Sequence, residues 1–257
     1  MLEHLSQTCL LADPNNHCAR IWDRFEDEVP EWTFVVIPFL STADSRHDFF
    51  VVNDIMEFID DALEGLTFLH AQGIAHRRVS PSTIRTDESP LYPGGFHPIV
   101  RWRLPDFTPR HAPSYSRSTA RTRVRNYYTG FGDAVPGGPP EAFRADVAAL
   151  GRLLDTYFTE RYSRTEFLAP LVADMKSGRP TAAEALAQWR ATRARTSWVG
   201  RMRRLPVRSD DESWVWVVLL DVFFMVLMLL ERLPAPVRLR MSAISCLPEN
   251  ASWYGWG

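Results

Sequence analysis

"LHAQGIAHRRVSPSTI", residues 69–84, joins the end of an apolar helix to a short polar loop. The run over 53–70 repeats apolar residues at spacings of three and four, which predicts an amphipathic helix. After Gly73, two apolar residues, Ile74 and Ile84, flank a segment of charged and hydroxyl side chains. The pattern predicts a loop anchored at both ends by buried side chains, with its polar groups gathered between them.

Composition is typical of a globular protein and excludes several functional classes. The 257 residues are 46% hydrophobic and 23% charged, and the net charge of −2 gives no field that would attract nucleic acid. The three cysteines show no Cys-x-x-Cys spacing and the histidines are scattered, so no metal site is expected. Sparse cysteines and the lack of a signal-peptide pattern favour the cytoplasm.

Local signals predict further elements on both sides of the loop. Two short strands are expected around an acidic turn at 26–30, and another strand at 124–129. Asn53 or Asp54 is expected to cap the first turn of the helix over 53–70. Helix is also predicted over 141–158 and after Thr181, which forms a capping box with Glu184.

The order of four motifs resembles that of a known family. After "LHAQGIAHRRVSPSTI" come "YYTGFGDA", "FRADVAALG" and "SGRPTAAEAL". In this order they resemble the C-terminal lobe of a eukaryotic protein kinase, and more narrowly the divergent, truncated kinase-like proteins of basidiomycete fungi. The resemblance covers residues 17–190. It implies an α+β, protein-kinase-like fold that is mostly the helical C-terminal lobe, with a truncated N-lobe of a few strands and a hinge.

The resemblance also implies how the chain is divided. The expected segments are an N-terminal tail at 1–16, an N-lobe remnant and hinge at 17–40, a kinase-like C-lobe at 41–195 and a C-terminal extension at 196–257. Within the C-lobe, 85–123 is rich in Arg, Pro and Ser and is interpreted as a long, solvated surface loop. Seven arginines between 101 and 125 leave a basic patch for an acidic partner as the alternative.

The resemblance assigns the catalytic positions to residues that lack the chemistry. Kinases use an Asp as base, a Lys near the γ-phosphate, and an Asn and a second Asp as magnesium ligands. These four positions are occupied here by Arg78, Ser80, Thr83 and Gly130 respectively. A guanidinium stays protonated and glycine offers no ligand, so the expected protein is a pseudokinase without bound metal.

One other alignment places a carboxylate at the metal position. Asp106 in "LPDFTPR" precedes a phenylalanine, as the metal-binding Asp of a kinase does. However, Pro105 interrupts the strand expected before it, whereas "VRNYYT" before Gly130 is a good strand pattern. Gly130 is therefore preferred, and Asp106 remains the weaker alternative.

The nucleotide clamp of the family is not found before the expected hinge at 37–40. The first glycine of these 257 residues is Gly65, so no glycine-rich loop precedes the hinge. The sole lysine, Lys176, lies far beyond it. Binding of ATP with magnesium is therefore not expected.

The residues that support the fold of the family, rather than its catalysis, are better matched in this sequence. The resemblance implies that Asp146 binds the loop backbone around His76 and Arg77, and that His76 is a packed core residue. It also implies that Glu141 forms a buried ion pair with Arg179.

The segment at 214–232, "WVWVVLLDVFFMVLMLLER", predicts a hydrophobic helix. Residues 214–230 are apolar except for Asp221, which is the lower edge of transmembrane length. A charged residue at the centre of such a span costs about 2.5–3.5 kcal/mol on insertion scales. A helix that packs on the domain or lies on a surface is favoured, and membrane contact through 214–230 remains the alternative.

Three functional hypotheses follow. The favoured one is a kinase-like domain without catalysis that binds an unidentified protein partner, or a remnant without function; no nucleic acid is expected. The first alternative is an active serine/threonine kinase with atypical residues. The second is a membrane-anchored interaction protein, which would make the chain membrane-associated rather than cytoplasmic.

Overall fold

The computed structural model describes most of the chain. The described residues are 1–26, 32–42, 49–101, 103–110, 117, 118, 120, 122–208, 222, 223 and 226. One compact unit spans residues 1–211 and a second spans 212–257. Apart from Val222, Phe223 and Val226, which are helical and exposed, the predicted helix at 214–232 lies outside the described residues.

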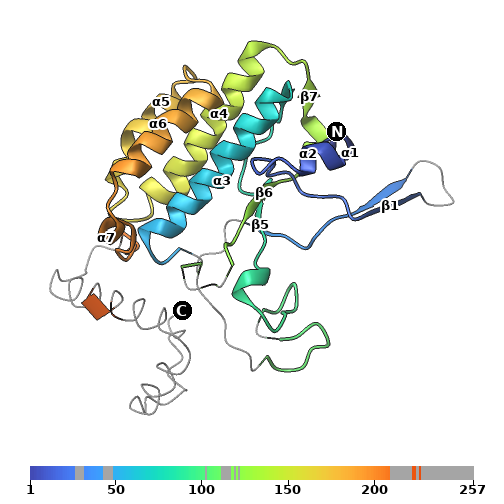
Figure 1. Ribbon diagram of the computed structural model, residues 1–257, viewed down its shortest axis with the longest axis horizontal. Helices are drawn as coiled ribbons and strands as arrows, with labels where there is room; N and C mark the ends of the chain where they lie inside the picture. Colours follow the sequence, from blue (N-terminus) through green and yellow to red (C-terminus); the bar gives the residue numbers. More distant parts are fainter. Residues whose placement is uncertain are drawn as a thin grey trace. The chain divides into compact units, whose positions relative to one another are not determined.

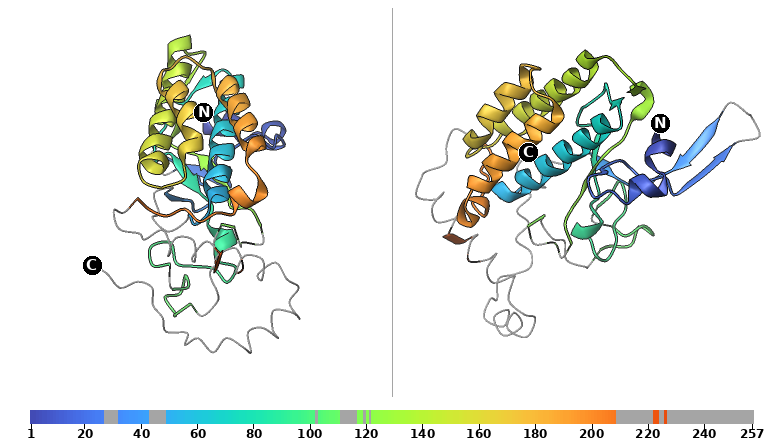
Figure 2. Two further views of the ribbon diagram at one scale, coloured as in Figure 1. Left: turned by 90° about the vertical axis from the view of Figure 1, so that its left-hand side faces the viewer. Right: turned by 45° about the horizontal axis from the view of Figure 1, so that its top comes forward.

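Four helices pack together as the main body of the first unit (Figures 1 and 2). Their bounds are α3, Val52–Ala71; α4, Pro140–Leu154; α5, Ala169–Lys176; and α6, Ala182–Arg195. The apolar face of α3 is buried against α4 and α6, as its periodicity predicts. The mixture of these helices with short strands agrees with the expected α+β class.

Helix termini follow the predicted chemistry in two places. Oδ2 of Asp54 accepts the backbone N–H groups of Phe50 and Val51 at 2.8 and 2.9 Å, so Asp54 caps the start of α3. The capping box of α6 is confirmed. Thr181 donates its backbone N–H to Glu184 at 2.8 Å, and the Glu184 N–H donates back to the Thr181 hydroxyl at 3.3 Å.

Helix α4 continues into a π-helical turn, η3, Asp155–Thr159, and then leads to α5, which the sequence did not predict. The two helices approach closely at Gly151. A Cβ there would lie 2.7 Å from Cβ of Met175 and 3.0 Å from the backbone N of Lys176. Glycine is required at this crossing because any side chain would push α5 away.

Two small sheets position the loop that follows α3. A three-stranded antiparallel sheet has the order β3, Ser41–Thr42; β5, Ile84–Thr86; and β6, Asn126–Tyr128. A second pair joins β4, Ile74–Ala75, to β7, Val135–Pro136. Because β4 and β5 are the two ends of the loop at 76–83, both sheets hold it beside the segment that connects β6 to β7.

The predicted strand pair before the hinge is present as β1, Asp23–Glu26, and β2, Thr33–Val36, paired antiparallel. All eight strand residues are exposed, and the hairpin projects away from the helices (Figure 1). Phe25 and Phe34 stack across the pair with ring centroids 5.2 Å apart. Trp22 and Trp32 nearby are 65% and 64% exposed.

The remaining elements are short. They are α1, Leu2–Leu5; α2, Thr8–Leu11; η1, Ser89–Leu91; η2, Phe131–Asp133; η4, Glu166–Leu168; and α7, Trp198–Arg201. Leu5 of α1 is fully buried in the main core. Within the described part of the chain, none of the helices is long and apolar enough to cross a membrane.

The interpretation of the arginine-rich segment as a solvated loop is wrong for Arg117, whereas Arg123 is exposed. Arg117 is only 3% exposed; it lies over the ring of Phe49 and donates to Oδ1 of Asn126 at 3.2 Å. Arg123 forms an ion pair with the buried Asp61 at 2.5 Å. Helix α3 buries the carboxylates of Asp54 and Asp61, and the positive charges of Arg117 and Arg123 respectively offset part of the cost of burying them.

Replacing Gly151 with alanine is predicted to lower the free energy of unfolding by about 1–3 kcal/mol, because the new Cβ overpacks the α4–α5 crossing. Alanine is otherwise the better helix former by about 1 kcal/mol, so propensity alone predicts the opposite sign. Urea unfolding followed by circular dichroism measures the change. Gly132→Ala, where an added Cβ meets nothing within 4 Å, is the matched control and is expected to be near neutral.

Candidate functional site

The loop at 76–83 is held by one carboxylate. Oδ2 of Asp146 accepts the backbone N–H of His76 and Oδ1 accepts that of Arg77, both at 2.7 Å. These are the contacts expected for Asp146. The side chain of Asp146 is buried near the middle of α4, and the two short hydrogen bonds to an acid are of the strong, charge-assisted kind.

The two hydrogen bonds also fix an unfavourable backbone conformation. Arg77 has φ +62°, in the left-handed region that costs a non-glycine residue about 1–2 kcal/mol. Its side chain is exposed, so the loop uses the backbone of Arg77 rather than its charge. Asp146 thus stabilises a sharp turn that the local sequence alone would not favour.

His76 is buried in the core of the loop. Its Nδ1 accepts the backbone N–H of Arg78 at 3.3 Å, so the proton lies on Nε2, which donates to the carbonyl of Thr129 at 3.0 Å. Burial lowers the pKa of His76 below its ordinary value, although the Thr129 carbonyl and the charge of Asp146 act in the opposite direction. His76 is therefore a neutral packing residue that ties the loop to the end of β6.

Hydroxyl groups occupy the interior of the loop. Oγ1 of Thr83 donates to the carbonyl of Arg78 at 2.6 Å and accepts the backbone N–H of Ser80 at 3.0 Å. The Ser80 and Thr83 hydroxyls lie 3.2 Å apart. Thr83, at the position that the resemblance assigns to a metal-binding amide, therefore closes the loop on itself with neutral hydrogen bonds.

Gly130 lies directly against Thr83. A Cβ on Gly130 would be 2.9 Å from Cγ2 of Thr83, and its φ of +74° is left-handed. The structure thus brings together two of the positions that the resemblance assigns to metal ligands. Neither carries a carboxylate or an amide.

Arg78 points toward the segment after Gly130. Its guanidinium lies 3.7 Å from Oδ2 of Asp133, and the two side chains are 66% and 58% exposed. An ion pair this exposed contributes little stability. Among the described residues, no group of three or more His, Cys, Asp or Glu side chains is arranged to hold a metal ion.

Asp106, the alternative metal-binding residue, is placed elsewhere. It lies in an exposed turn, where its Oδ1 accepts the N–H of Thr108 at 3.0 Å and the hydroxyl of Thr108 at 2.7 Å. These hydrogen bonds lower the pKa of Asp106. Gly130, and not Asp106, is the residue that contacts Thr83.

The prediction of a buried ion pair between Glu141 and Arg179 is wrong. Both residues belong to the described part of the chain, both are exposed, and they form no ion pair with each other. Arg179 is 80% exposed and lies 3.7 Å from Asp174. Glu141 precedes Asp146 by five residues on α4, which places it roughly 140° around the helix from the inward-facing carboxylate.

Sequence reasoning missed two polar contributions around the site. Nε2 of His70 lies 3.3 Å from Oδ2 of Asp146, so α3 also supports the central carboxylate. Farther along α3, Asp60 receives Nε1–H of Trp189 at 2.8 Å and the guanidinium of Arg193. Burial raises the pKa of Asp60, and these partners offset part of that cost. The several acids along α3 were the signal that could have predicted arginine partners for this helix.

Comparisons with known proteins show a similarity to protein kinases. No family model matches the sequence. A stretch of 97 residues is 31% identical to the serine/threonine-protein kinase PkaB of Streptomyces coelicolor, and it covers 37% of this chain. The chain is similar to protein kinases. The match spans 22% of the length of PkaB, about a fifth of that curated relative.

Two solved structures are also similar to the chain. The crystal structure of the Rad53 kinase domain and SCD2 is 17% identical, with a TM-score of 0.46, covering 73% of each chain. The crystal structure of the same Rad53 kinase domain and SCD2 in complex with AMPPNP is 16% identical, with a TM-score of 0.41, covering 69% of this chain and 74% of that one.

Replacing Gly130 with aspartate, the residue that would install a carboxylate beside the loop, is predicted to destabilise the protein by about 1–3 kcal/mol. The cause is the left-handed backbone combined with the contact to Cγ2 of Thr83. Thr83→Ser removes Cγ2 but keeps the hydroxyl, so it is predicted to recover about 1 kcal/mol of that loss in the double variant. A double-mutant cycle by urea unfolding measures the coupling, and strict additivity would contradict the adjacency of the two residues.

His76 is predicted to make stability depend on pH. Its folded pKa lies below the unfolded value near 6.5, so the stability from the neutral imidazole is full above that value. It is lost as pH falls from about 6.5 toward the folded pKa, by up to about 1.4 kcal/mol per pH unit. Urea unfolding between pH 7.5 and 5.5 measures the slope.

The dependence of the free energy of unfolding on pH is expected to become less steep in His76→Gln, whatever the absolute stability of that variant. His4→Gln, which removes an exposed imidazole, is the control and is expected to leave the slope unchanged. An equal slope in the His76 variant and the wild type would refute the assignment of a buried neutral histidine.

Proposed function

We propose that this protein is a kinase-like domain that does not transfer phosphate and that acts by binding another protein. Similarity to protein kinases supports the kinase-like part of the proposal. The contact between Thr83 and Gly130 supports the rest, because two of the family's metal-binding positions meet there without a metal ligand.

Among the described residues around this contact, none replaces the missing groups. Arg78 is a permanent cation and cannot accept the proton of an attacking hydroxyl. Asp146 already accepts two backbone N–H groups, and moving it would release the turn at Arg77. Asp133 is exposed and lies next to a guanidinium, an environment that does not favour a general base. These features are independent of any residues that precede the chain.

A binding role is supported by the β1–β2 hairpin. It exposes aromatic residues from both strands, together with Trp22 and Trp32, whereas isolated two-stranded hairpins are at best marginally stable in water. Large exposed apolar patches are typical of protein interaction surfaces. We therefore propose the hairpin as the surface that a protein partner covers.

An active serine/threonine kinase is the second candidate function. The specific observation in its favour is the 31% identity to PkaB, which is named as such an enzyme. The chemistry of the loop argues against this candidate. The four positions that the resemblance assigns to phosphoryl transfer are occupied by Arg78, Ser80, Thr83 and Gly130.

Addition of Mg-ATP is predicted to leave the melting temperature of the protein unchanged within about 1 °C, because no residue of the loop can hold the metal–phosphate group. Differential scanning fluorimetry with millimolar Mg-ATP measures the shift. A ligand present at 100 times its Kd would stabilise the fold by about 2.7 kcal/mol, which is several degrees for a protein of this size.

The same titration with Asp133→Asn is the matched control, since the carboxylate of Asp133 lies 3.7 Å from the guanidinium of Arg78. A shift of several degrees in the wild type that Asp133→Asn removes would contradict the proposal and assign the metal to Asp133. Transfer of radioactive phosphate from ATP to a generic protein substrate would contradict it outright.

A further inference from the structure

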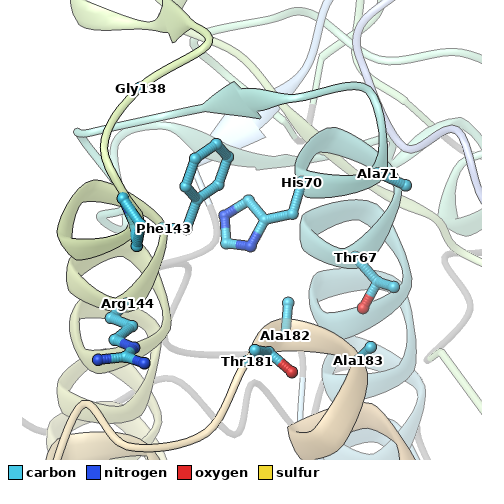
Figure 3. A pocket seen from close by; sticks show the side chains of 10 residues that line it. Thr67, His70, Ala71, Gly138, Phe143, Arg144, Thr181, Ala182 and Ala183 are labelled. Atoms are coloured by element: carbon cyan, nitrogen blue, oxygen red, sulfur yellow. The ribbon is translucent and has the colours of Figure 1, made fainter.

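The two ends of the helical body differ in charge. Where α3 ends and α4 and α6 begin, a cavity of about 520 Å³ is lined mostly by small and apolar side chains, with Arg144 in its wall (Figure 3). The other end, where α6 finishes and α7 follows, is formed by residues 190–208, here called the basic end. Its sequence contains no Asp or Glu and seven arginines: Arg190, Arg193, Arg195, Arg201, Arg203, Arg204 and Arg208.

The last part of the basic end is fixed against the start of α3. The N–H of Val52 donates to the carbonyl of Arg203 at 3.0 Å, and the N–H of Leu205 donates to the carbonyl of Phe50 at 2.8 Å. Helix α7 also lies close to α3 (Figure 1). The positive side chains of the basic end therefore extend from a backbone that the helical body holds in place.

Only some of these arginines are neutralised within the fold. Arg190 and Arg193 form ion pairs with two acids of α3. Arg201 donates to backbone carbonyls at the end of α6, which leaves its charge uncompensated. Arg195 and Arg203 are exposed, and their side chains form no hydrogen bond or ion pair with the described part of the chain. The basic end thus presents positive charge that is available to an external partner.

This positive charge persists when the acidic residues that follow are counted. Asp210, Asp211 and Glu212 come next in the sequence and lie outside the described residues. Seven arginines and three acids give residues 190–212 a net charge of +4, although the whole chain has a net charge of −2. Attraction to an anionic surface would therefore come from this local charge and not from the protein as a whole.

Apolar side chains are exposed among the arginines. Trp198 is 46% exposed, Val199 52% and Val207 53%. Tryptophan combines an apolar ring with a polar N–H group, and it is enriched where protein meets the boundary between lipid and water. Arginine beside exposed tryptophan and valine is a composition that fits this boundary.

The chain continues from the basic end into the apolar stretch at 214–230. Three residues of this stretch are described, Val222, Phe223 and Val226, and they are helical with exposed side chains. Their spacing places them on one side of a helix. A cluster of arginines next to an apolar helix is typical of segments that lie on an anionic membrane. The exposed apolar side chains favour a membrane over an acidic protein, which would compensate the arginines alone.

We infer that the basic end holds the protein on the surface of an anionic membrane, with Arg195 and Arg203 bound to lipid headgroups and Trp198 placed in the interfacial layer. This inference goes beyond the proposed function and does not depend on it, because the protein partner is assigned to the β1–β2 hairpin.

Cosedimentation of the full chain with lipid vesicles tests the inference. Vesicles of phosphatidylcholine alone are compared with vesicles that also contain phosphatidylserine. We expect binding to the anionic vesicles to be stronger by about tenfold or more, and to weaken several-fold at about 0.5 M salt, where charges are screened over a few ångströms. Equal binding to both kinds of vesicle, or no binding, would overturn the inference. Release of the protein from the vesicles by soluble polyglutamate at equal charge would assign the basic end to acidic proteins and overturn it too.

Arginine variants locate the surface. Arg195→Gln combined with Arg203→Gln is expected to weaken binding to anionic vesicles about 20-fold, since each arginine near such a surface contributes about fivefold. Arg125→Gln combined with Arg144→Gln removes the same charge from exposed positions in the arginine-rich segment and beside the cavity. This control is expected to bind like the wild type. Equal losses in the two double variants would overturn the assignment to the basic end.

Trp198→Ala tests insertion into the interfacial layer. The variant is expected to bind anionic vesicles about tenfold more weakly, because the buried apolar area is lost, while its melting temperature stays unchanged. Trp22→Ala, which removes a 65% exposed tryptophan beside the β1–β2 hairpin, is the control and is expected to bind vesicles like the wild type. Unchanged binding in Trp198→Ala, or an equal loss in Trp22→Ala, would overturn the role given to Trp198.

Discussion

The loop at 76–83 depends on the carboxylate of Asp146 and its hydrogen bonds to two consecutive backbone N–H groups, those of His76 and Arg77. They hold Arg77 in a left-handed conformation, which turns the chain after β4 and places Thr83 beside Gly130. Helix α4 carries the carboxylate and α3 supports it through His70. Both helices therefore contribute to the position of the loop, together with the contacts of His76 and Thr83 to the segment around Gly130.

A loop built in this way can keep its shape when its catalytic residues change. Its anchors are backbone groups, the neutral ring of His76 and the hydroxyl of Thr83, and none of them requires a bound metal or nucleotide. The absence of a side chain at Gly130 relieves the contact with Thr83 and permits the left-handed backbone. Within this short segment, the residues that hold the fold are thus different from those that the resemblance assigns to phosphoryl transfer. This separation explains how similarity to kinases and the proposed loss of their chemistry can coexist.

Sequence patterns predicted the features that depend on local chemistry. The period of α3, the capping box at Thr181 and the strand before Gly130 are all encoded within a few residues. Features that depend on packing between distant segments were not predictable. The burial of Arg117 depends on contacts with Phe49 and Asn126, which nothing near Arg117 in the sequence indicates. The pairing of Glu141 with Arg179, implied by the resemblance, fails because matching motifs carry no information about the direction in which each side chain points. Helix α5 was missed because it is only eight residues long and has weak amphipathic character.

The central claim is that the loop is held by the protein alone and does not respond to nucleotide. Hydrogen–deuterium exchange of the amides of His76 and Arg77, with and without millimolar Mg-ATP, tests both parts in one measurement. The account predicts strong protection of both amides in the free protein, since each donates to a buried carboxylate, and no change on addition of Mg-ATP. Fast exchange in the free protein that becomes protected with Mg-ATP would contradict it.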